Sequence, residues 1–228
     1  SPFYHMKPQF AHKILDQVKL DYDTIASEFS ATRQAPWEEF KLFKPYIPAG
    51  STLADIGCGN GRLIPSVPKD CQYTGIDISQ NLISQAQQAF PEKRFLLGSL
   101  LDIPLESGSI NTTLCIASLH HIPSKELREK AVDELLRITK PGGYLIITVW
   151  NLWQRKYLKF IIKALRGKIT FGDLEYNDLF IPWNNKVLRY YHAFTKGELT
   201  RLLRKKCKII DVAIESKHNI IIICQKEE

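Results

Sequence analysis

A glycine-rich turn is the stretch of this sequence whose residue types point most directly to chemistry. The segment DIGCGNG runs from Asp55 to Gly61 and continues a short apolar run. Gly57, Gly59 and Gly61 allow a backbone to turn sharply and to approach a ligand without side-chain clashes. A second acid, Asp77, ends the next apolar run, where a carboxylate reaches both hydroxyls of a ribose. The pattern therefore predicts a site for a ligand that carries a ribose.

The spacing of the glycines differs from two common nucleotide-binding motifs. It reads GxGxG, whereas the dinucleotide-binding turn reads GxGxxG. No GK[ST] follows, as it would in a phosphate-binding P-loop. By itself such a turn also occurs as a tight connection between a strand and a helix, so the two flanking acids are what favour a binding site.

The elements that must position these residues alternate between strand and helix. Helical spacing and N-cap residues predict helices over 79–90, 124–140 and 195–206. This alternation indicates βαβ units and a parallel sheet, closed by two final strands that pair antiparallel. Between the two halves of the pattern, residues 151–194 are aromatic, basic and irregular. The stretch 52–61 is predicted to be a short apolar strand that ends in the glycine turn. Apolar runs predict further strands over 72–79, 94–99, 110–121, 144–150, 207–216 and 218–226.

Composition limits the class of protein. The 228 residues suffice for one large domain, and 44% hydrophobic residues support a packed core. The net charge of +7 has two readings, an anionic partner such as nucleic acid or a simple lysine bias for solubility. No apolar run reaches the length of about 18 residues that spans a membrane. Residues 1–5 are interpreted as a cloning remnant ahead of a native start at Met6.

The cysteines indicate the compartment. Five cysteines lie far apart and form no CxxC pair, so we expect neither a zinc site nor any other metal site in this chain. Most of them lie in apolar runs and are interpreted as buried free thiols. That usage is typical of a reducing cytoplasm.

The order of these motifs resembles the class I S-adenosylmethionine-dependent methyltransferases over residues 37–150 and 195–226. The resemblance implies an α/β, Rossmann-like fold with a seven-stranded, mostly parallel sheet, helices on both faces and the last strand antiparallel. It also implies a single methyltransferase domain over 6–228, with a lid at about 20–37 and a substrate-side insertion at about 151–194. The cofactor would be S-adenosylmethionine and the product S-adenosylhomocysteine.

The same resemblance assigns cofactor contacts. The glycine turn would cradle the methionine part, Asp55 would lie near its amino group, and Asp77 would hold the ribose. Tyr22 and Arg33 would close over the cofactor carboxylate, which a guanidinium binds through two hydrogen bonds. Ser99 stands where such enzymes usually carry an acid for the adenine amine. The full set of expected cofactor residues is Tyr22, Arg33, Asp55, Gly57, Cys58, Gly59, Asp77, Ile78, Ser99, Leu100 and Ala117.

Three further stretches are more specific: YDTIASEFSATRQAPW, CIASLHHI and DLFIPWNNKVLRYYHAFTKGEL. They resemble the tRNA methyltransferases that esterify the carboxymethyl group of the wobble uridine in the anticodon loop. A base flipped out of that loop needs aromatic walls and cationic groups, and Trp153 and Arg155 are further candidates for these. The alternative is that these aromatics pack the insertion's own core. The residues expected to bind substrate are Trp37, His121, Trp150, Trp183, Tyr190 and His192, and the expected catalytic residues are His120, Arg33, Arg189 and Tyr191.

The implied mechanism needs no general base. A carboxylate has a pKa near 4, so the substrate group is ionised at neutral pH, and catalysis consists mainly of positioning. The two histidines should therefore orient the substrate. Because neighbours at a strand end point to opposite sides, we expect one of them to face the pocket, and favour His120 over His121.

Members of this family commonly work with a small zinc-binding activator protein, which would add a strand at the sheet edge near Arg94–Ser99. Two other functions stay open on the sequence. One is methylation of an oxygen, nitrogen or carbon of a small molecule by the same fold. The other is a non-catalytic scaffold that binds the cofactor. The sequence does not identify the tRNA isoacceptor.

Overall fold

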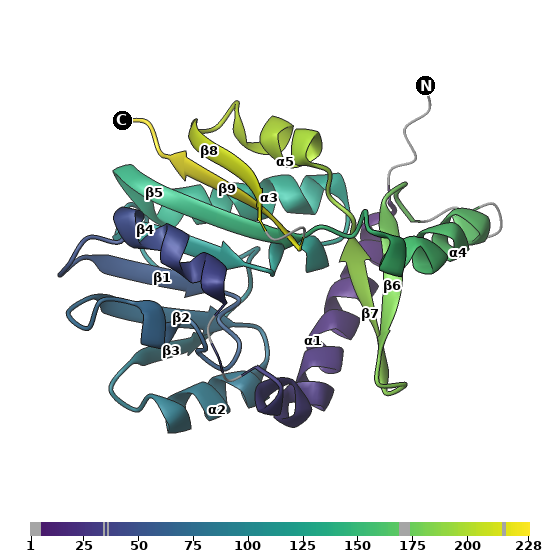
Figure 1. Cartoon of the computed structure of the whole chain (residues 1–228), viewed down its shortest axis with the longest axis horizontal. Helices are drawn as coiled ribbons and strands as arrows, with labels where there is room; N and C mark the ends of the chain where they lie inside the picture. Colours follow the sequence, from purple (N-terminus) through teal and green to yellow (C-terminus); the bar gives the residue numbers. More distant parts are fainter. Residues whose placement is uncertain (1–5, 34, 36, 169–173, 216–217) are drawn as a thin grey trace.

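The computed structural model describes residues 6–33, 35, 37–168, 174–215 and 218–228. Its centre is a seven-stranded sheet in the order β3-β2-β1-β4-β5-β9-β8 (Figure 1). Only β9 runs against its neighbours, pairing antiparallel with both β5 and β8. The predicted sheet is therefore confirmed. The strands are β1 (Thr52–Ile56), β2 (Gln72–Asp77), β3 (Arg94–Leu97), β4 (Ile110–Ile116), β5 (Thr139–Trp150), β8 (Lys208–Glu215) and β9 (Asn219–Gln225).

Helices cover both faces of the sheet. The predicted caps are confirmed in α2 (Gln80–Ala89), α3 (Lys125–Ile138) and α5 (Lys196–Leu203), where a hydroxyl accepts from a backbone N–H in the first turn. One apolar cluster packs α3 and α5 on one face. A second packs α2 and the 3-10 helix η1 (Glu38–Tyr46) on the other. A short 3-10 turn, η2 (Ile64–Ser66), follows the glycine turn.

The N-terminal segment forms one long helix, α1 (Pro8–Ala31), beside the sheet. Its buried residues Ala11, Ile14 and Val18 pack against Tyr190 of the insertion. Residues 20–31 of the predicted lid form the second half of this helix. That arrangement fixes Tyr22 and Arg33 relative to the insertion.

The described parts of the insertion contain regular elements, although its sequence pattern is irregular. It contains η4 (Arg155–Tyr157), α4 (Leu158–Lys168) and a hairpin of β6 (Asp178–Trp183) and β7 (Val187–His192). The hairpin turns at Asn184 and Asn185, whose φ angles of 45° and 56° suit asparagine. Lys186 in this turn forms an ion pair with Glu28 of α1. The hairpin therefore stands against α1, apart from the main sheet (Figure 1).

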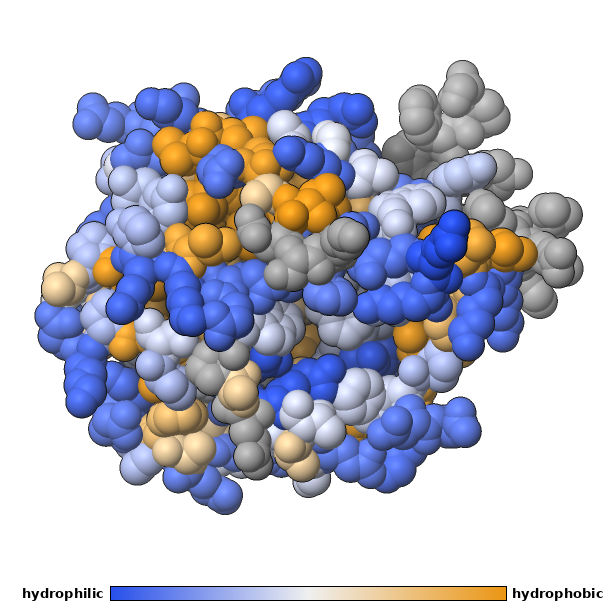
Figure 2. Space-filling model, in the orientation of Figure 1, coloured by the Kyte–Doolittle hydropathy of each residue, from blue (hydrophilic) through white to orange (hydrophobic). Residues whose placement is uncertain are grey.

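Hydrophilic residues cover most of the face drawn in Figure 2, and an apolar area lies over the β5, β9 and β8 end of the sheet. Exposed apolar side chains of β8 include Ile210 and Ile214. No helix within the described residues is both long enough and apolar enough to cross a membrane.

Candidate active site

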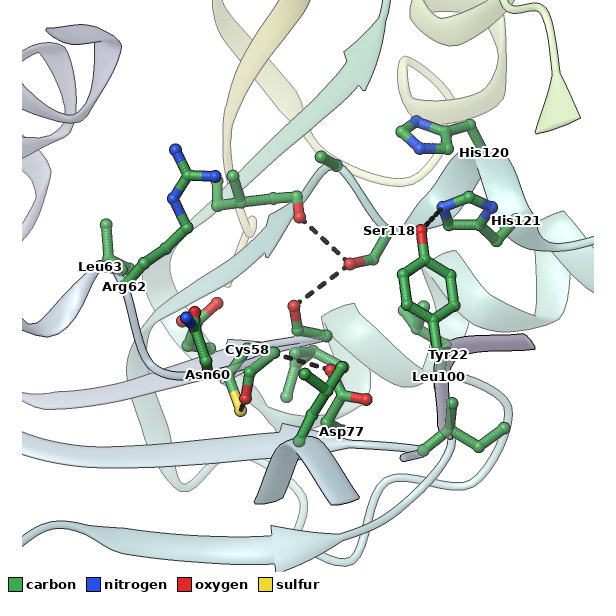
Figure 3. Close-up of a pocket in the computed structure, with 18 of the residues that line it drawn as sticks. Tyr22, Cys58, Asn60, Arg62, Leu63, Asp77, Leu100, Ser118, His120 and His121 are labelled. Atoms are coloured by element: carbon green, nitrogen blue, oxygen red, sulfur yellow. Dashed lines mark hydrogen bonds between the residues drawn. The ribbon is translucent and has the colours of Figure 1, made fainter. Parts of the chain in front are cut away.

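A deep cavity opens at the carboxyl ends of β1, β2 and β4, where the sequence predicted it (Figure 3). Its empty volume is about 1140 Å³, open solvent at the mouth included. The glycine turn forms its floor, with φ angles of 80° at Gly57 and 55° at Gly59. A Cβ added at Gly57 would lie 2.0 Å from Oγ of Ser118, so only glycine fits there.

Asp77 is anchored at the rim of this floor. Its Oδ2 accepts a hydrogen bond from the Gly59 N–H at 2.8 Å, and its Oδ1 accepts one from the Ser79 N–H at 2.9 Å. Burial nevertheless raises the pKa of Asp77 above its ordinary value. Each oxygen keeps acceptor capacity beyond these bonds, so the carboxylate can take two further donors such as ribose hydroxyls.

Asp55 lies deeper in the floor. Its Oδ2 accepts a hydrogen bond from the Tyr73 hydroxyl at 2.9 Å, and burial raises the pKa of Asp55 to about 7. A cationic amino group close to this carboxyl would favour its ionised form. Cys58 is buried beside it, and burial raises the pKa of its thiol, so the cysteine contributes a neutral wall.

The remaining predicted cofactor residues also line the cavity. Ser99 uses its hydroxyl oxygen to accept from the Leu101 N–H at 3.1 Å. Ser118 was missed by sequence reasoning, although its hydroxyl bonds to the carbonyls of Gly57 and Ile116. The predicted residues at the cavity wall are Tyr22, Arg33, Ile78, Ser99, Leu100 and Ala117.

The positions of His120 and His121 differ from the prediction. Strand β4 ends at Ile116, and His120 and His121 lie in a 3-10 turn, η3 (Leu119–His121). Both therefore line the cavity, and neither packs behind it, because a turn does not alternate its side chains as a strand does. His121 Nε2 is bonded to the Tyr22 hydroxyl at 2.7 Å (Figure 3). Burial lowers the pKa of His121 to about 3 and that of His120 well below its ordinary value.

Aromatic rings of the hairpin pack behind the cavity wall, against His120 and Trp150, and none of Trp183, Arg189 and Tyr191 lines the cavity itself. Tyr191 stacks on Trp150 and on His120, with ring centroids 5.3 Å and 5.2 Å apart. The guanidinium of Arg189 lies 4.7 Å from the ring centre of Trp183 and 5.2 Å from that of Tyr191. The structure thus brings these predicted residues together, although β7 and η3 are far apart in the sequence.

Arg33 and Trp37 approach the same wall from the N-terminal side. The Arg33 guanidinium lies 4.6 Å from the ring centre of Trp183 and 4.2 Å from that of Phe29. Trp37 lines the cavity and holds the guanidinium of Arg62 over its ring. The two further candidates, Trp153 and Arg155, are exposed and line neither cavity, and the Trp153 indole N–H donates to the carbonyls of Ala193 and Phe194. Arg33 thus lines the cavity, whereas Arg189 lies behind its wall, and among the described residues neither arginine forms an ion pair. The charge of Arg189 nevertheless offsets part of the rise that burial causes in the pKa of Asp21.

Four buried polar atoms in this cluster have no protein partner. They are Nε2 of His120, Nε1 of Trp183, Nε of Arg189 and the Tyr191 hydroxyl. His120 Nδ1 accepts from the Trp150 N–H at 3.2 Å, so the neutral ring carries its proton on Nε2. All four atoms are therefore hydrogen-bond donors, and leaving a buried donor unpaired costs about 1–3 kcal/mol. An acceptor oxygen of a ligand in the cavity would satisfy His120 Nε2, the one of these donors whose residue lines the cavity.

Tyr190 and His192 do not face the cavity, contrary to prediction. His192 Nδ1 is 2.8 Å from Asp178 and its Nε2 is 2.7 Å from Glu198. Burial alone would lower the pKa of His192, but these two hydrogen bonds raise it. The Tyr190 hydroxyl also donates to Asp178, at 2.7 Å. Both residues alternate with Arg189 and Tyr191 along β7, so they point to the opposite face and hold the hairpin in place.

This network continues to Glu175, which pairs with Arg128 of α3. Glu175, Asp178 and His192 place ligand atoms within 4.8 Å of one another, a spacing that a cation could use. The groups that a cation would need are already engaged with Arg128, Tyr190 and Glu198. We therefore interpret the cluster as a structural ion-pair network.

Comparison with known proteins agrees with this geometry. Residues 54–147 match the family model described as "Methyltransferase domain". The tRNA (carboxymethyluridine(34)-5-O)-methyltransferase of Schizosaccharomyces pombe is 30% identical over 221 residues, which is 87% of this chain and 90% of that protein. The protein of the same name from Mus musculus is 41% identical over 155 residues, 67% of this chain and 22% of that protein. This chain thus spans about a fifth of the mouse protein's length.

Solved structures share the fold. An S-adenosylmethionine-dependent methyltransferase from Methanosarcina mazei aligns with a TM-score of 0.71 at 22% identity, covering 85% of this chain and 99% of that one. A putative methyltransferase of Haloferax volcanii, solved in complex with the Trm112 methyltransferase activator, aligns with a TM-score of 0.64 at 14% identity. That match covers 91% of this chain and 98% of the other. At these identities the likeness shows the fold alone.

Proposed function

Because this chain belongs to the tRNA (carboxymethyluridine(34)-5-O)-methyltransferase family of class I methyltransferases, we propose that it methylates the carboxylate of 5-carboxymethyluridine at the wobble position of tRNA. S-adenosylmethionine is the methyl donor. The observation that carries the choice of substrate is a set of four unpaired donors, of which His120 Nε2 lies at the cavity and the other three lie behind its wall. A carboxylate offers acceptor oxygens and negative charge to such a set, whereas an amine or a carbon nucleophile does not.

The floor of the cavity fits the cofactor. The glycine turn leaves no room for a Cβ at Gly57, and its glycines let a ligand approach the backbone closely. Asp77 would accept from the ribose hydroxyls, and Asp55 would accept from the amino group. When bound, S-adenosylmethionine supplies a methyl group on a positively charged sulfur.

Side chains in and behind the cavity wall would position the substrate. The substrate carboxylate is ionised at neutral pH, so the chain needs no general base. His120 is kept neutral by burial and presents an N–H at Nε2, which makes it a donor to the substrate. Arg189 and Tyr191 would hold the carboxylate, and Trp150 would stack on the base. Holding the reacting atoms in contact is the main source of rate in such a transfer.

A direct test is mass spectrometry of nucleosides from tRNA that carries 5-carboxymethyluridine, after incubation with the protein and isotope-labelled S-adenosylmethionine. We expect the label in the wobble nucleoside alone. Arg201→Gln is a suitable control, because Arg201 lies in α5, outside both cavity walls. Labelling of a small metabolite, with none in tRNA, would contradict the proposal and favour a small-molecule methyltransferase.

We also propose that a small zinc-binding activator protein adds a strand along β3. This strand stands at the end of the sheet order, and its Leu97 is 48% exposed. An unpaired strand edge with an apolar side chain is a template for strand addition. The Haloferax neighbour solved with an activator supports this idea at the level of the fold.

The test of the activator proposal is co-purification with a Trm112-type protein. Leu97→Asp should abolish a stable complex. Ile214→Asp, on the opposite edge strand β8 and 49% exposed, should leave it intact. Equal loss in both variants, or full methylation by the isolated chain with no gain from the activator, would contradict the proposal.

Finally, we propose a cytoplasmic location. The five cysteines are free and buried, which suits a reducing compartment. Imaging of the tagged full-length protein would test this, and a signal confined to a membrane-bound organelle would contradict it.

A further inference from the structure

A second cavity adjoins the first and is not explained by the methyl transfer itself. It shares Arg33, Trp37, Arg62 and Trp150 with the first cavity and extends from them toward η4. Its empty volume is about 1050 Å³, open solvent included. The two cavities are therefore neighbours that have these four residues in common.

Arg62 is held rigidly on the shared wall, and sequence reasoning gave it no role. Its guanidinium lies 4.3 Å from the ring centre of Trp37, and one terminal nitrogen donates to the Ala35 carbonyl at 3.2 Å. Its Nε is buried without a protein partner. Burial, and to a smaller extent the nearby charge of Arg33, lowers the pKa of Arg62 to about 10. The guanidinium therefore stays protonated at neutral pH.

Cationic side chains outnumber acidic ones on the walls of the second cavity. Arg33 and Lys156 join Arg62 on its walls, and the Lys156 ammonium lies 4.9 Å from the ring centre of Tyr157. Two acids also line it. Glu38 is paired with Lys41, and Glu39 accepts from the Asn219 amide at 3.3 Å.

Three aromatic rings, those of Trp37, Trp150 and Tyr157, stand among these cations. Aromatic faces interleaved with cations are typical of sites for single-stranded nucleic acid, where bases stack and phosphates meet positive charge. A simple carboxylate would have no use for the rings. This combination distinguishes the second cavity from a plain anion site.

We propose that the second cavity binds a nucleotide next to the methylated one, with Arg62 holding its phosphate beside Trp37 and with Lys156 and Tyr157 contacting the rest of it. The inference rests on the proposed function, since it takes the substrate to be an RNA loop. The cofactor carboxylate is the other anion within reach of this wall, because Arg62 also lines the first cavity. The experiment must therefore distinguish binding of an RNA phosphate by Arg62 from binding of the cofactor carboxylate.

The variants are Arg62→Gln and Lys156→Gln, with the exposed Arg201→Gln as the charge-matched control. An anticodon stem-loop RNA is titrated by fluorescence anisotropy over a range of salt, and S-adenosylmethionine by calorimetry. Arg62→Gln and Lys156→Gln should each weaken RNA binding about tenfold, equivalent to about 1.4 kcal/mol, and make the salt dependence shallower by about one counterion. Cofactor affinity should stay within about twofold, and Arg201→Gln should behave as the unmodified protein.

Three outcomes would overturn the inference: unchanged RNA affinity in both variants, a loss equal to that of Arg201→Gln, or a fall in cofactor affinity in Arg62→Gln. Should Arg62→Gln fail to fold, Lys156→Gln still tests the inference, because Lys156 is exposed. Arg62→Lys is then a second test, because it keeps the charge and should retain most RNA binding. Failure of the proposed function is separable. In that case the unmodified protein leaves tRNA unmethylated, whereas failure of this inference leaves methylation present and RNA binding insensitive to Arg62.

Discussion

Replacing Arg189 by methionine should remove methyl transfer while leaving the fold intact. Arg189 is only 3% exposed, and no ion pair of its guanidinium is found among the described residues. Its Nε has no partner, which costs about 1–3 kcal/mol in the folded state. Contacts with three rings, at about 0.5–2 kcal/mol each, and one long hydrogen bond to Tyr22 at 3.4 Å offset that cost together with the cost of burying the charge. The net change in stability should therefore be near zero.

Methionine keeps contact with the rings, so the melting temperature should move by less than about 4 °C. Losing a hydrogen bond to a charged substrate costs about 1.5–3 kcal/mol, which lowers kcat/KM for tRNA by roughly 10- to 150-fold. The assay combines thermal unfolding, calorimetry with S-adenosylmethionine and methyl transfer to tRNA. Cofactor affinity should be unchanged.

Arg128→Met is the matched control, because Arg128 is also a buried arginine but pairs with Glu175. Its loss leaves a carboxylate without its cation and should destabilise the fold by about 3–5 kcal/mol. If Arg189→Met instead loses stability and cofactor binding together, as Arg128→Met should lose stability, then Arg189 is a packing residue and the reasoning is wrong.

Three further predictions follow from the site. Asp77→Asn should weaken S-adenosylmethionine binding by about 1–3 kcal/mol in calorimetry, and unchanged affinity would remove the ribose assignment. Gly57→Ala should abolish cofactor binding, because its Cβ would meet Ser118 at 2.0 Å, and normal binding would show that the turn is not the cradle. The raised pKa of His192 should give stability that is complete below about pH 6.5 and is lost as pH rises through the folded-state pKa. His192→Gln should therefore cost most stability near pH 6 and progressively less toward about pH 9 in urea unfolding, and a pH-independent difference would contradict this.

The cofactor side of the molecule was predictable from the sequence because local chemistry decides it. Asp55 and Asp77 each end an apolar strand, and parallel strands bring their carboxyl ends to one edge. The glycines were informative for the same reason, since positive φ angles and close backbone approach restrict the choice of residue. The N-caps Ser79 and Ser124 likewise act within one helical turn.

The substrate side was harder because tertiary packing decides it. The dipeptide Asn184–Asn185 was a usable signal for a two-residue hairpin turn and was overlooked. With the hairpin known, alternation along β7 would have separated Arg189 and Tyr191 from Tyr190 and His192. Arg62 carried no sequence signal, because its role depends on a ring contributed by a distant segment.

The most direct test of the central claim uses the chemistry of the product. Transfer-RNA containing 5-carboxymethyluridine is incubated with the protein, its candidate activator and S-adenosylmethionine labelled in the methyl group, and the RNA is then treated with mild alkali. A methyl ester hydrolyses under these conditions, so we predict that the wobble nucleoside loses its label and that labelled methanol is released. Label that stays on the nucleoside would mean that the methyl sits on nitrogen, carbon or an ether oxygen, and would contradict methylation of a carboxylate.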